Sequence, residues 1–247
     1  MPTPTALITG GTTGIGRATA ELLHGRGHRV IVTGRDPSSV ATARSSLPEG
    51  IEVVRSDAAS MPCLESLVEL VQQRLGTLDV LFLNAGITRP GPTESFDEAV
   101  YDELFAVNTK SAFFTLARTL PLLRDGASVI VTVGLGAARG VVGGAATAGS
   151  RGALLAMVPS LALELAPRRI RVNAVSPGAV RTGIWAKSGL APDALEAALA
   201  SYAANIPFGR LASARDVAEV VAFLASDAAG YITGENITVS GGSGLRP

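Results

Sequence analysis

The chain has 247 residues, of which 47% are hydrophobic and 17% are charged, so it is long enough to bury one large α/β core. Its 21 basic and 21 acidic residues balance, which argues against nucleic acid or an anionic membrane as the partner and favours a small-molecule substrate. A single cysteine, Cys63, excludes an intramolecular disulfide and suits a reducing compartment.

The start of the sequence predicts a cytoplasmic protein, because Met1 to Pro4 lead directly into an apolar segment without the features of a secretory signal. The least charged stretch, residues 127–150, contains Arg139 and many glycines. It therefore predicts a strand and a loop, and no membrane span. No group of Cys, His and Asp residues has the spacing of metal ligands, so we predict no metal site.

Short apolar or β-branched runs alternate with longer helical patterns along the whole chain. The runs are almost wholly apolar, as expected of strands that are covered on both faces. The alternation predicts an α/β, doubly wound Rossmann fold: a parallel seven-stranded sheet in the order 3-2-1-4-5-6-7, with helices on both faces and one domain over residues 1–247. The predicted strands are residues 6–9, 29–33, 51–54, 80–83, 128–133, 171–175 and 236–239.

Two acidic residues predict the beginnings of helices. Asp36 precedes Pro37, and proline is a favoured first helical residue. Asp216 stands directly before the apolar pattern of residues 217–224. Arg171 opens a predicted strand after other arginines, and we expect its side chain to be solvated.

Residues 147–165 predict a helix that is apolar on more than one face, with Met157 and Leu163 outside the main apolar stripe. One face has to cover the sheet, so the other predicts a homo-oligomer, a dimer or tetramer; burial under a later insert is the alternative. That insert, residues 183–209, interrupts the β/α rhythm and predicts a lid over a ligand. Its Trp185 and Phe208 suit an apolar or polycyclic substrate.

A glycine-rich turn follows the first predicted strand. Gly10, Gly14 and Gly16 let the backbone turn tightly and approach a diphosphate, which then meets the free N–H groups of a helix that starts near Arg17. Between a buried strand and a helix, this pattern indicates a dinucleotide site. The same segment also supplies Thr12, Thr13 and Ile15.

The end of the second predicted strand favours NADPH over NADH. An acidic residue there takes the ribose hydroxyls of NAD, whereas a basic residue suits a 2′-phosphate. Gly34 stands in the place of the acid, and Arg35 offers planar donors to phosphate and adenine. Asp36 is the competing candidate, but its neighbour Pro37 indicates a helix start.

Together these motifs resemble the short-chain dehydrogenase/reductase family over essentially the whole chain. The glycine turn, the run Asn84-Ala85-Gly86 and Asn108 all resemble motifs of that family. The resemblance implies NADP(H) binding and hydride transfer between nicotinamide and a carbonyl or alcohol. It adds to the cofactor site the aspartate that follows the third strand and the segment that lines the nicotinamide: Asp57, Pro177, Gly178, Val180 and Thr182.

The catalytic residues of the family are missing from this chain, apart from Asn108. The family uses a tyrosine as general acid, a lysine that lowers the tyrosine pKa and holds the ribose, and a serine that binds the carbonyl oxygen. These positions fall on Thr147, Arg151 and Gly134. No tyrosine occurs between Tyr101 and Tyr202, so realignment does not restore the acid.

These replacements predict slow reduction of ordinary ketones. A threonine hydroxyl is a far weaker acid than a phenol, whose reference pKa is about 10. Losing the general acid typically costs roughly 10² to 10⁴ in rate, and losing one oxyanion donor costs about 10² to 10³. An arginine at position 151 can still bond ribose hydroxyls.

Three functions therefore stay open, of which the first is favoured. The chain is an NADPH-dependent reductase whose proton comes from Tyr202, from water or from the substrate, which is a ketone, quinone, conjugated or iminium acceptor. Alternatively it is a non-redox enzyme, such as a cyclase, dehydratase or epimerase, that orients its substrate in the pocket. The third hypothesis is a catalytically silent binding or assembly subunit.

Overall fold

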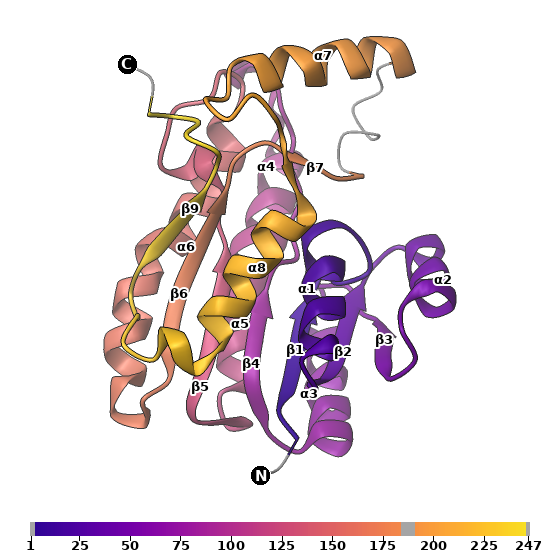
Figure 1. The fold of residues 1–247 in the computed structure, drawn as a ribbon, viewed down its shortest axis with the longest axis vertical. Coiled ribbons are helices and arrows are strands. Elements are labelled where there is room, and N and C mark those ends of the chain that lie inside the picture. The colour runs from indigo at the N-terminus through magenta and orange to yellow at the C-terminus, as the bar shows by residue number, and fades with distance from the viewer. Residues whose placement is uncertain (1–2, 184–190, 246–247) are drawn as a thin grey trace.

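The computed structural model describes residues 3–183 and 191–245. Figure 1 shows a central sheet with helices packed around it. The strands are β1 Thr5–Thr9, β2 Arg29–Gly34, β3 Ile51–Arg55, β4 Leu78–Leu83, β5 Leu123–Thr132, β6 Arg171–Pro177, β7 Val180–Arg181, β8 Ala212–Ser213 and β9 Asn236–Val239. The α-helices are α1 Gly14–Gly25, α2 Pro37–Ser46, α3 Met61–Leu75, α4 Glu98–Phe105, α5 Ser111–Thr119, α6 Ala145–Leu165, α7 Pro192–Ala204 and α8 Ala214–Ala225.

The main sheet has seven strands that pair in parallel, in the order β3-β2-β1-β4-β5-β6-β9. Because β9 is the seventh strand of this sheet along the chain, the predicted fold class and strand order are confirmed. The predicted strand positions also hold, although β4 and β5 begin earlier, at Leu78 and Leu123. β7 and β8 form a separate pair.

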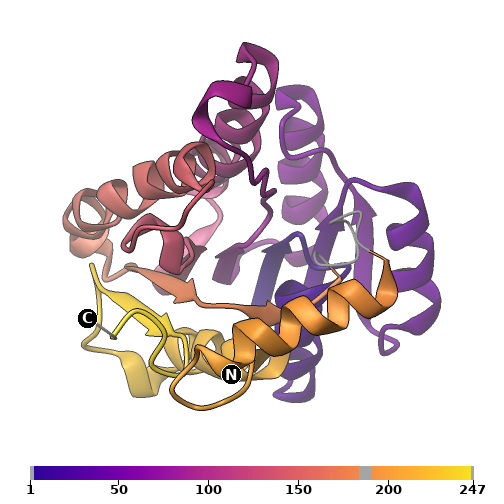
Figure 2. The ribbon, with the colours of Figure 1, turned by 90° about the horizontal axis from the view of Figure 1, so that it is seen from above.

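Both faces of the sheet are buried, which explains why its strands are almost wholly apolar. Neighbouring residues of β1 point to opposite faces. Ile8 belongs to the core under α1, α2 and α8, and Leu7 belongs to the core under α3, α5 and α6. Seen from above, the helices lie in layers on the two sides of the sheet (Figure 2).

The strand order creates a crevice above β1. The chain leaves β1 toward β2 on one side and returns to β4 on the other, so the connections part at the carboxyl ends of these strands. Figure 1 shows α7 lying across this end of the molecule. Ligands of doubly wound sheets bind in such a crevice.

Three local expectations differ from the structure. α1 begins at Gly14, not near Arg17. α8 begins at Ala214, where Ser213 is the N-cap and Asp216 completes a capping box. Arg171 is wrongly expected to be solvated: it is only 8% exposed, because its guanidinium donates to main-chain oxygens at the end of α8.

The capping box is expected to stabilise α8, which packs against the cofactor-side helix α1. Ser213→Ala removes the hydroxyl that accepts from the Asp216 amide at 3.1 Å and donates to its carboxylate at 2.8 Å. We expect a loss of about 1 kcal/mol in the free energy of unfolding, measured as a fall of roughly 2–4 °C in Tm.

Ser45→Ala is the matched control, because Ser45 is an exposed serine inside α2 whose hydroxyl bonds only the Thr42 carbonyl. Its free energy of unfolding should change by less than about 0.5 kcal/mol. Equal effects of the two substitutions would contradict the role of the cap.

Candidate active site

The turn after β1 needs each of its three motif glycines for a separate reason. Gly10 has φ +64° and Gly14 has φ +55°, a left-handed region that favours glycine. A Cβ on Gly16 would overlap the Gly10 carbonyl oxygen and lie 2.7 Å from Nδ2 of Asn84. The glycine spacing found in the sequence therefore matches a tightly folded backbone turn.

This turn leaves the first N–H groups of α1 available to a ligand. Thr13 is the N-cap residue, its side chain makes no capping hydrogen bond, and the first turn carries no acidic residue. Ile15 is partly buried behind the turn. An anion at this helix end meets unbonded amides and the positive end of the helix dipole.

Packing explains why Gly34 stands where an NAD site has an acid. Thr12 is buried beside the end of β2, and a Cβ on Gly34 would lie 2.6 Å from its Cγ2 atom. Arg35 follows with a side chain that is 52% exposed. Asp36 caps α2, as predicted: its Oδ2 accepts from the Ser39 amide at 2.8 Å.

The end of β4 is tied to the glycine turn by hydrogen bonds. Asn84 donates from Nδ2 to the main-chain oxygens of Thr9, at 3.3 Å, and of Gly10, at 3.1 Å. Its Oδ1 accepts from the Thr132 hydroxyl at 3.1 Å. The Ala85 amide donates to Oγ1 of Thr9 at 3.1 Å. Asn84 and Ala85 thus hold the shape of the site through the backbone.

Asp57 and the residues predicted to line the nicotinamide lie at the same end of the sheet. Asp57 follows β3, and its Oδ1 accepts from the Ala59 amide at 3.0 Å. Gly178 donates its amide to the Val239 oxygen at 3.0 Å, which holds the end of β6 against β9. Thr182 lies over the glycine turn, with its Cγ2 atom 3.3 Å from a Cβ built on Gly14. The remaining members of this group are Pro177, the last residue of β6, and Val180, which is buried in β7.

Asn108 lies in a π-helix, Ala106–Lys110, between α4 and α5. Its side chain is fully buried, and both of its polar atoms form hydrogen bonds. Oδ1 accepts from the Ile87 amide at 2.8 Å, while Nδ2 donates to the Ile87 oxygen at 3.0 Å and to Oγ of Ser150 at 2.9 Å. A π-helical turn often marks a functional site. Here it links the segment after β4 to α6.

The hydroxyl of Thr147 forms hydrogen bonds with the main chain of Arg89. Its Oγ1 accepts from the Arg89 amide at 3.2 Å and donates to the Arg89 oxygen at 3.3 Å. A hydroxyl has one proton to donate, and this one goes to a carbonyl. Thr147 is therefore poorly arranged to protonate a substrate.

Arg151 lies one turn after Thr147 on α6 and points back toward β5. Its Nη1 donates to the Thr132 oxygen at 2.6 Å. A Cβ on Gly86 would overlap its guanidinium, so this approach requires glycine there. Burial lowers the pKa of Arg151 to about 10. In the part of the chain that the structure describes, no carboxylate lies within ion-pair distance of this cation.

Gly134 follows the end of β5 and contributes no side chain to the site. Its φ is +101°, and the atom nearest to a Cβ built there is the Pro177 oxygen at 4.0 Å. A serine at this position would have room but would strain the backbone. Restoring the family serine by a single substitution is therefore not a simple side-chain exchange.

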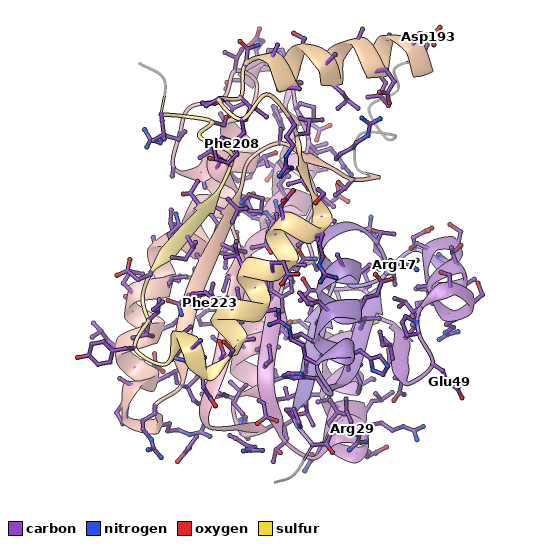
Figure 3. The ribbon with its side chains drawn as sticks, in the orientation of Figure 1. Arg17, Arg29, Glu49, Asp193, Phe208 and Phe223 are labelled. Atoms are coloured by element: carbon purple, nitrogen blue, oxygen red, sulfur yellow. The ribbon has the colours of Figure 1, made fainter. Side chains whose placement is uncertain are left out.

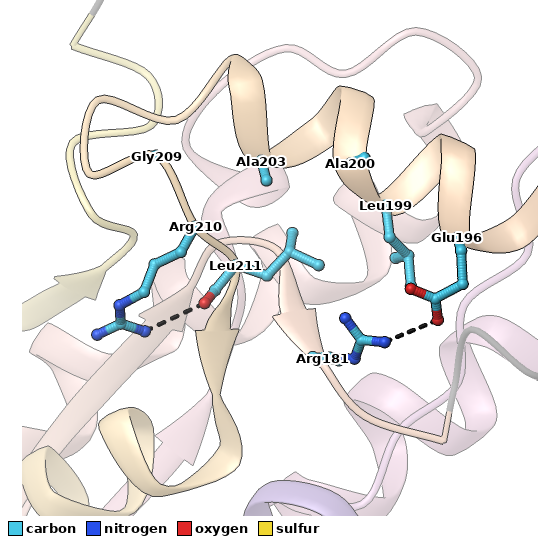
Figure 4. A pocket seen from close by; sticks show the side chains of 8 residues that line it. All are labelled: Arg181, Glu196, Leu199, Ala200, Ala203, Gly209, Arg210 and Leu211. Carbon is cyan, nitrogen blue, oxygen red and sulfur yellow. Dashed lines mark hydrogen bonds and ion pairs between the residues drawn. The ribbon is translucent and has the colours of Figure 1, made fainter.

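α7 carries Tyr202, which is 50% exposed, and Phe208 beyond its end is 76% exposed. Figure 3 shows Asp193 at the start of α7 and Phe208 beyond its other end. Trp185 lies outside the described residues. Beneath α7, a pocket of about 280 Å³ separates the helix from β7 and β8, and Figure 4 shows the ion pair that crosses it, Arg181 Nη2 to Glu196 Oε1 at 2.7 Å.

The structure brings together several residues that sequence reasoning missed. Ser150 bonds Asn108, Thr132 receives Arg151, and the Arg89 backbone receives Thr147. Glu103 approaches Arg35. Each of these contacts joins residues at least 19 positions apart in the chain, so no local spacing indicates them.

The described residues offer neither a metal-ligand cluster nor a membrane-spanning helix. No group of three or more His, Cys, Asp and Glu residues lies close enough together to hold a metal ion. None of the helices found there has both the length and the apolar character needed to cross a membrane.

Known proteins resemble the chain over almost its full length. A family profile described as enoyl-(acyl carrier protein) reductase matches residues 10–244. 2,3-Dihydro-2,3-dihydroxybenzoate dehydrogenase of Bacillus subtilis is 34% identical, covering 97% of this chain and 95% of that protein. 3-Oxoacyl-(acyl-carrier-protein) reductase FabG of Salmonella typhimurium is 35% identical over 96% of each chain. The crystal structure of levodione reductase has a TM-score of 0.92 and 28% identity, covering 99% and 98% of the two chains.

The fold and these relatives define an oxidoreductase built on a Rossmann-type sheet. The chain belongs to the short-chain dehydrogenase/reductase family, whose members use NAD(P)H.

The glycine turn provides a direct test of the cofactor site. Gly16→Ala places a methyl group against the Gly10 oxygen and Asn84, so the turn has to open. We expect NADPH binding, measured by calorimetry, to weaken by about 5- to 150-fold if the bound turn carries the overpacking cost of typically 1–3 kcal/mol.

Gly25→Ala is the control in the same helix, because a Cβ there meets nothing within 4 Å. It should leave NADPH affinity unchanged. Normal binding by the Gly16→Ala variant would show that the diphosphate does not rest on this turn.

Proposed function

We propose that the protein is an NADPH-dependent reductase that transfers hydride to a conjugated carbonyl compound or quinone without a tyrosine acid. The observation that carries the proposal is the contrast within one site. The amides of α1 stand ready for a diphosphate, while Thr147 gives its proton to a main-chain oxygen and Gly134 has no side chain. We propose a small, apolar or polycyclic molecule as substrate, and the described part of the predicted insert, residues 191–209, as a lid above it. Residues 184–190 of that insert lie outside the described residues.

The preference for NADPH is supported by the charge at the end of β2. Gly34 cannot accept a side chain without displacing Thr12, and Asp36 is used as a helix cap. An acid that takes ribose hydroxyls is thus absent from both positions. Arg35 follows directly with an exposed guanidinium, which suits a 2′-phosphate.

Arg35→Gln is expected to weaken NADPH binding by about 10- to 100-fold, the value of a charge-assisted hydrogen bond. NADH binding, which involves no 2′-phosphate, should stay the same. Calorimetry with both dinucleotides measures the two affinities. Arg74→Gln is the control, because Arg74 is an exposed arginine in a comparably long ion pair, 3.6 Å from Glu52. An unchanged NADPH preference in Arg35→Gln would refute the assignment.

The choice of acceptor follows from the charge of Arg151. NADPH, when bound, would supply a hydride to a conjugated carbon of the acceptor, whose π-electron pair would shift to its carbonyl oxygen. The Arg151 guanidinium, which has no carboxylate partner among the described residues, would stabilise that oxyanion, and water would supply the proton. NADP and the reduced acceptor are the products. A cationic iminium acceptor would meet like charge, so conjugated carbonyls and quinones fit better.

Arg151→Met is expected to lower the rate of acceptor reduction by about 10² to 10³, the usual effect of losing an oxyanion donor. Arg151→Lys keeps the charge and should recover part of that rate. The oxidation of NADPH is followed by its absorbance with a panel of enones, quinones and simple ketones. A melting temperature close to that of the parent shows that the variant is folded. An equal rate in Arg151→Met and parent would contradict this role, and silence with the whole panel would count against reduction.

A non-redox reaction is the second candidate, favoured by the open space beside Gly134. A cyclase, dehydratase or epimerase could use that space to orient its substrate. Formation of product with no consumption of nucleotide distinguishes this candidate. For a silent subunit, co-purification with a tyrosine-bearing relative would be the evidence.

The apolar surface of α6 supports a homo-oligomer, a dimer or tetramer. Leu163 on this helix is 78% exposed, although the helix covers the sheet on its other side. Association of copies through such a surface would remove it from water.

A further inference from the structure

Glu103 links two arginines at the edge of the proposed cofactor site. It lies on α4, and its two carboxylate oxygens face different partners. Oε1 is 3.7 Å from Nη1 of Arg35, and Oε2 is 3.0 Å from Nη2 of Arg89. The Glu103 side chain is 33% exposed, so it is reachable from solvent but not fully screened.

The carboxylate of Glu103 is the only one within 4.0 Å of Arg35 among the described residues. The nearby acids Asp36 and Asp57 accept main-chain amides at a helix start and in a turn. Glu103 therefore lies beside one nitrogen of the guanidinium that a 2′-phosphate would need.

We propose that Glu103 is a specificity-determining residue that competes with the cofactor 2′-phosphate for Arg35. This inference rests on the proposed function, in which Arg35 binds that phosphate. Glu103 then lowers the affinity for NADPH below the level that Arg35 alone would give, and it leaves NADH untouched. It thereby moderates the cofactor preference.

An opposite role, in which Glu103 orients Arg35 for the phosphate, is weaker on physical grounds. The contact is long, and the Arg35 side chain is 52% exposed. Exposed ion pairs of this kind contribute little orientation. The shorter contact of Glu103 is made to Arg89 instead.

Glu103→Gln tests the proposal, because glutamine keeps the size of the side chain and can still accept from Arg89. Calorimetry at low and at physiological salt should show NADPH binding tightened by about three- to tenfold, with the larger gain at low salt. NADH binding should change by less than about twofold, because NADH carries no 2′-phosphate. Unchanged or weaker NADPH binding would overturn the proposal.

Glu52→Gln is the matched control: Glu52 is also partly exposed and lies 3.6 Å from an arginine, Arg74, outside the proposed site. Its NADPH affinity should equal that of the parent. An equal gain in this variant would mean that general charge, and not competition at Arg35, is responsible.

A double variant separates the mechanism from the proposed function. In an Arg35→Gln background, Glu103→Gln should tighten NADPH binding much less, because the arginine for which it competes is gone. A full gain there would indicate direct repulsion and refute competition. If the parent binds NADPH no better than NADH, the proposed function fails. If Arg35→Gln abolishes the preference while Glu103→Gln has no effect, only the present inference fails.

Discussion

The site depends on the close approach of the turn after β1 to the end of β4. Gly16 lies so near the Gly10 oxygen that no side chain fits between them, and Asn84 bonds the same oxygen. The Thr9 hydroxyl receives the amide of Asn84, which locks β4 against the turn. The main-chain oxygens of Thr9 and Gly10 are therefore already hydrogen-bonded to Asn84. The amides that follow Thr13, at the start of α1, have no side-chain cap. The packing that closes the fold thus also exposes the donors that an anionic linker needs.

The hydroxyl groups of α6 form hydrogen bonds within the protein, unlike the amides at the start of α1. Thr147 bonds the backbone of Arg89, and Ser150 receives Asn108, so each hydroxyl serves to join α6 to the segment after β4. Polar groups that are satisfied in this way rigidify a site but offer little to a reacting molecule. Arg151 on the same helix differs, because it carries a buried charge and has no carboxylate within ion-pair distance among the described residues. For this reason the chemistry proposed above relies on charge stabilisation and takes its proton from elsewhere.

The parts of the structure that follow from local pattern were predictable from the sequence, and those set by distant partners were not. The Asp36 cap and the glycine spacing each depend on residues close together in the chain. The strand order joins distant segments, but it follows from the regular alternation of strands and helices along the chain. Arg171 looked solvated because nothing in its own segment indicates that carbonyls at the end of α8 would bind it. The meeting of Glu103 with Arg35 likewise depends on how α4 packs beside the end of β2. The hydrogen bonds of the Thr147 hydroxyl to the Arg89 main chain likewise depend on a segment far away in the chain.

Burial of the charged Arg151 guanidinium destabilises the folded protein, and no carboxylate among the described residues compensates for it. Burial lowers its pKa to about 10, below the ordinary range of arginine, so the unfolded chain binds this proton more tightly than the folded chain does. Stability therefore rises as the pH increases above about 10, and the full, constant penalty applies below that value. Near neutral pH Arg151 is charged, so its burial lowers the free energy of unfolding throughout this range. A residue that keeps such a penalty, held by the Thr132 carbonyl and accommodated by the bare backbone of Gly86, is better explained by a negative charge that arrives with the reaction than by any contribution to folding.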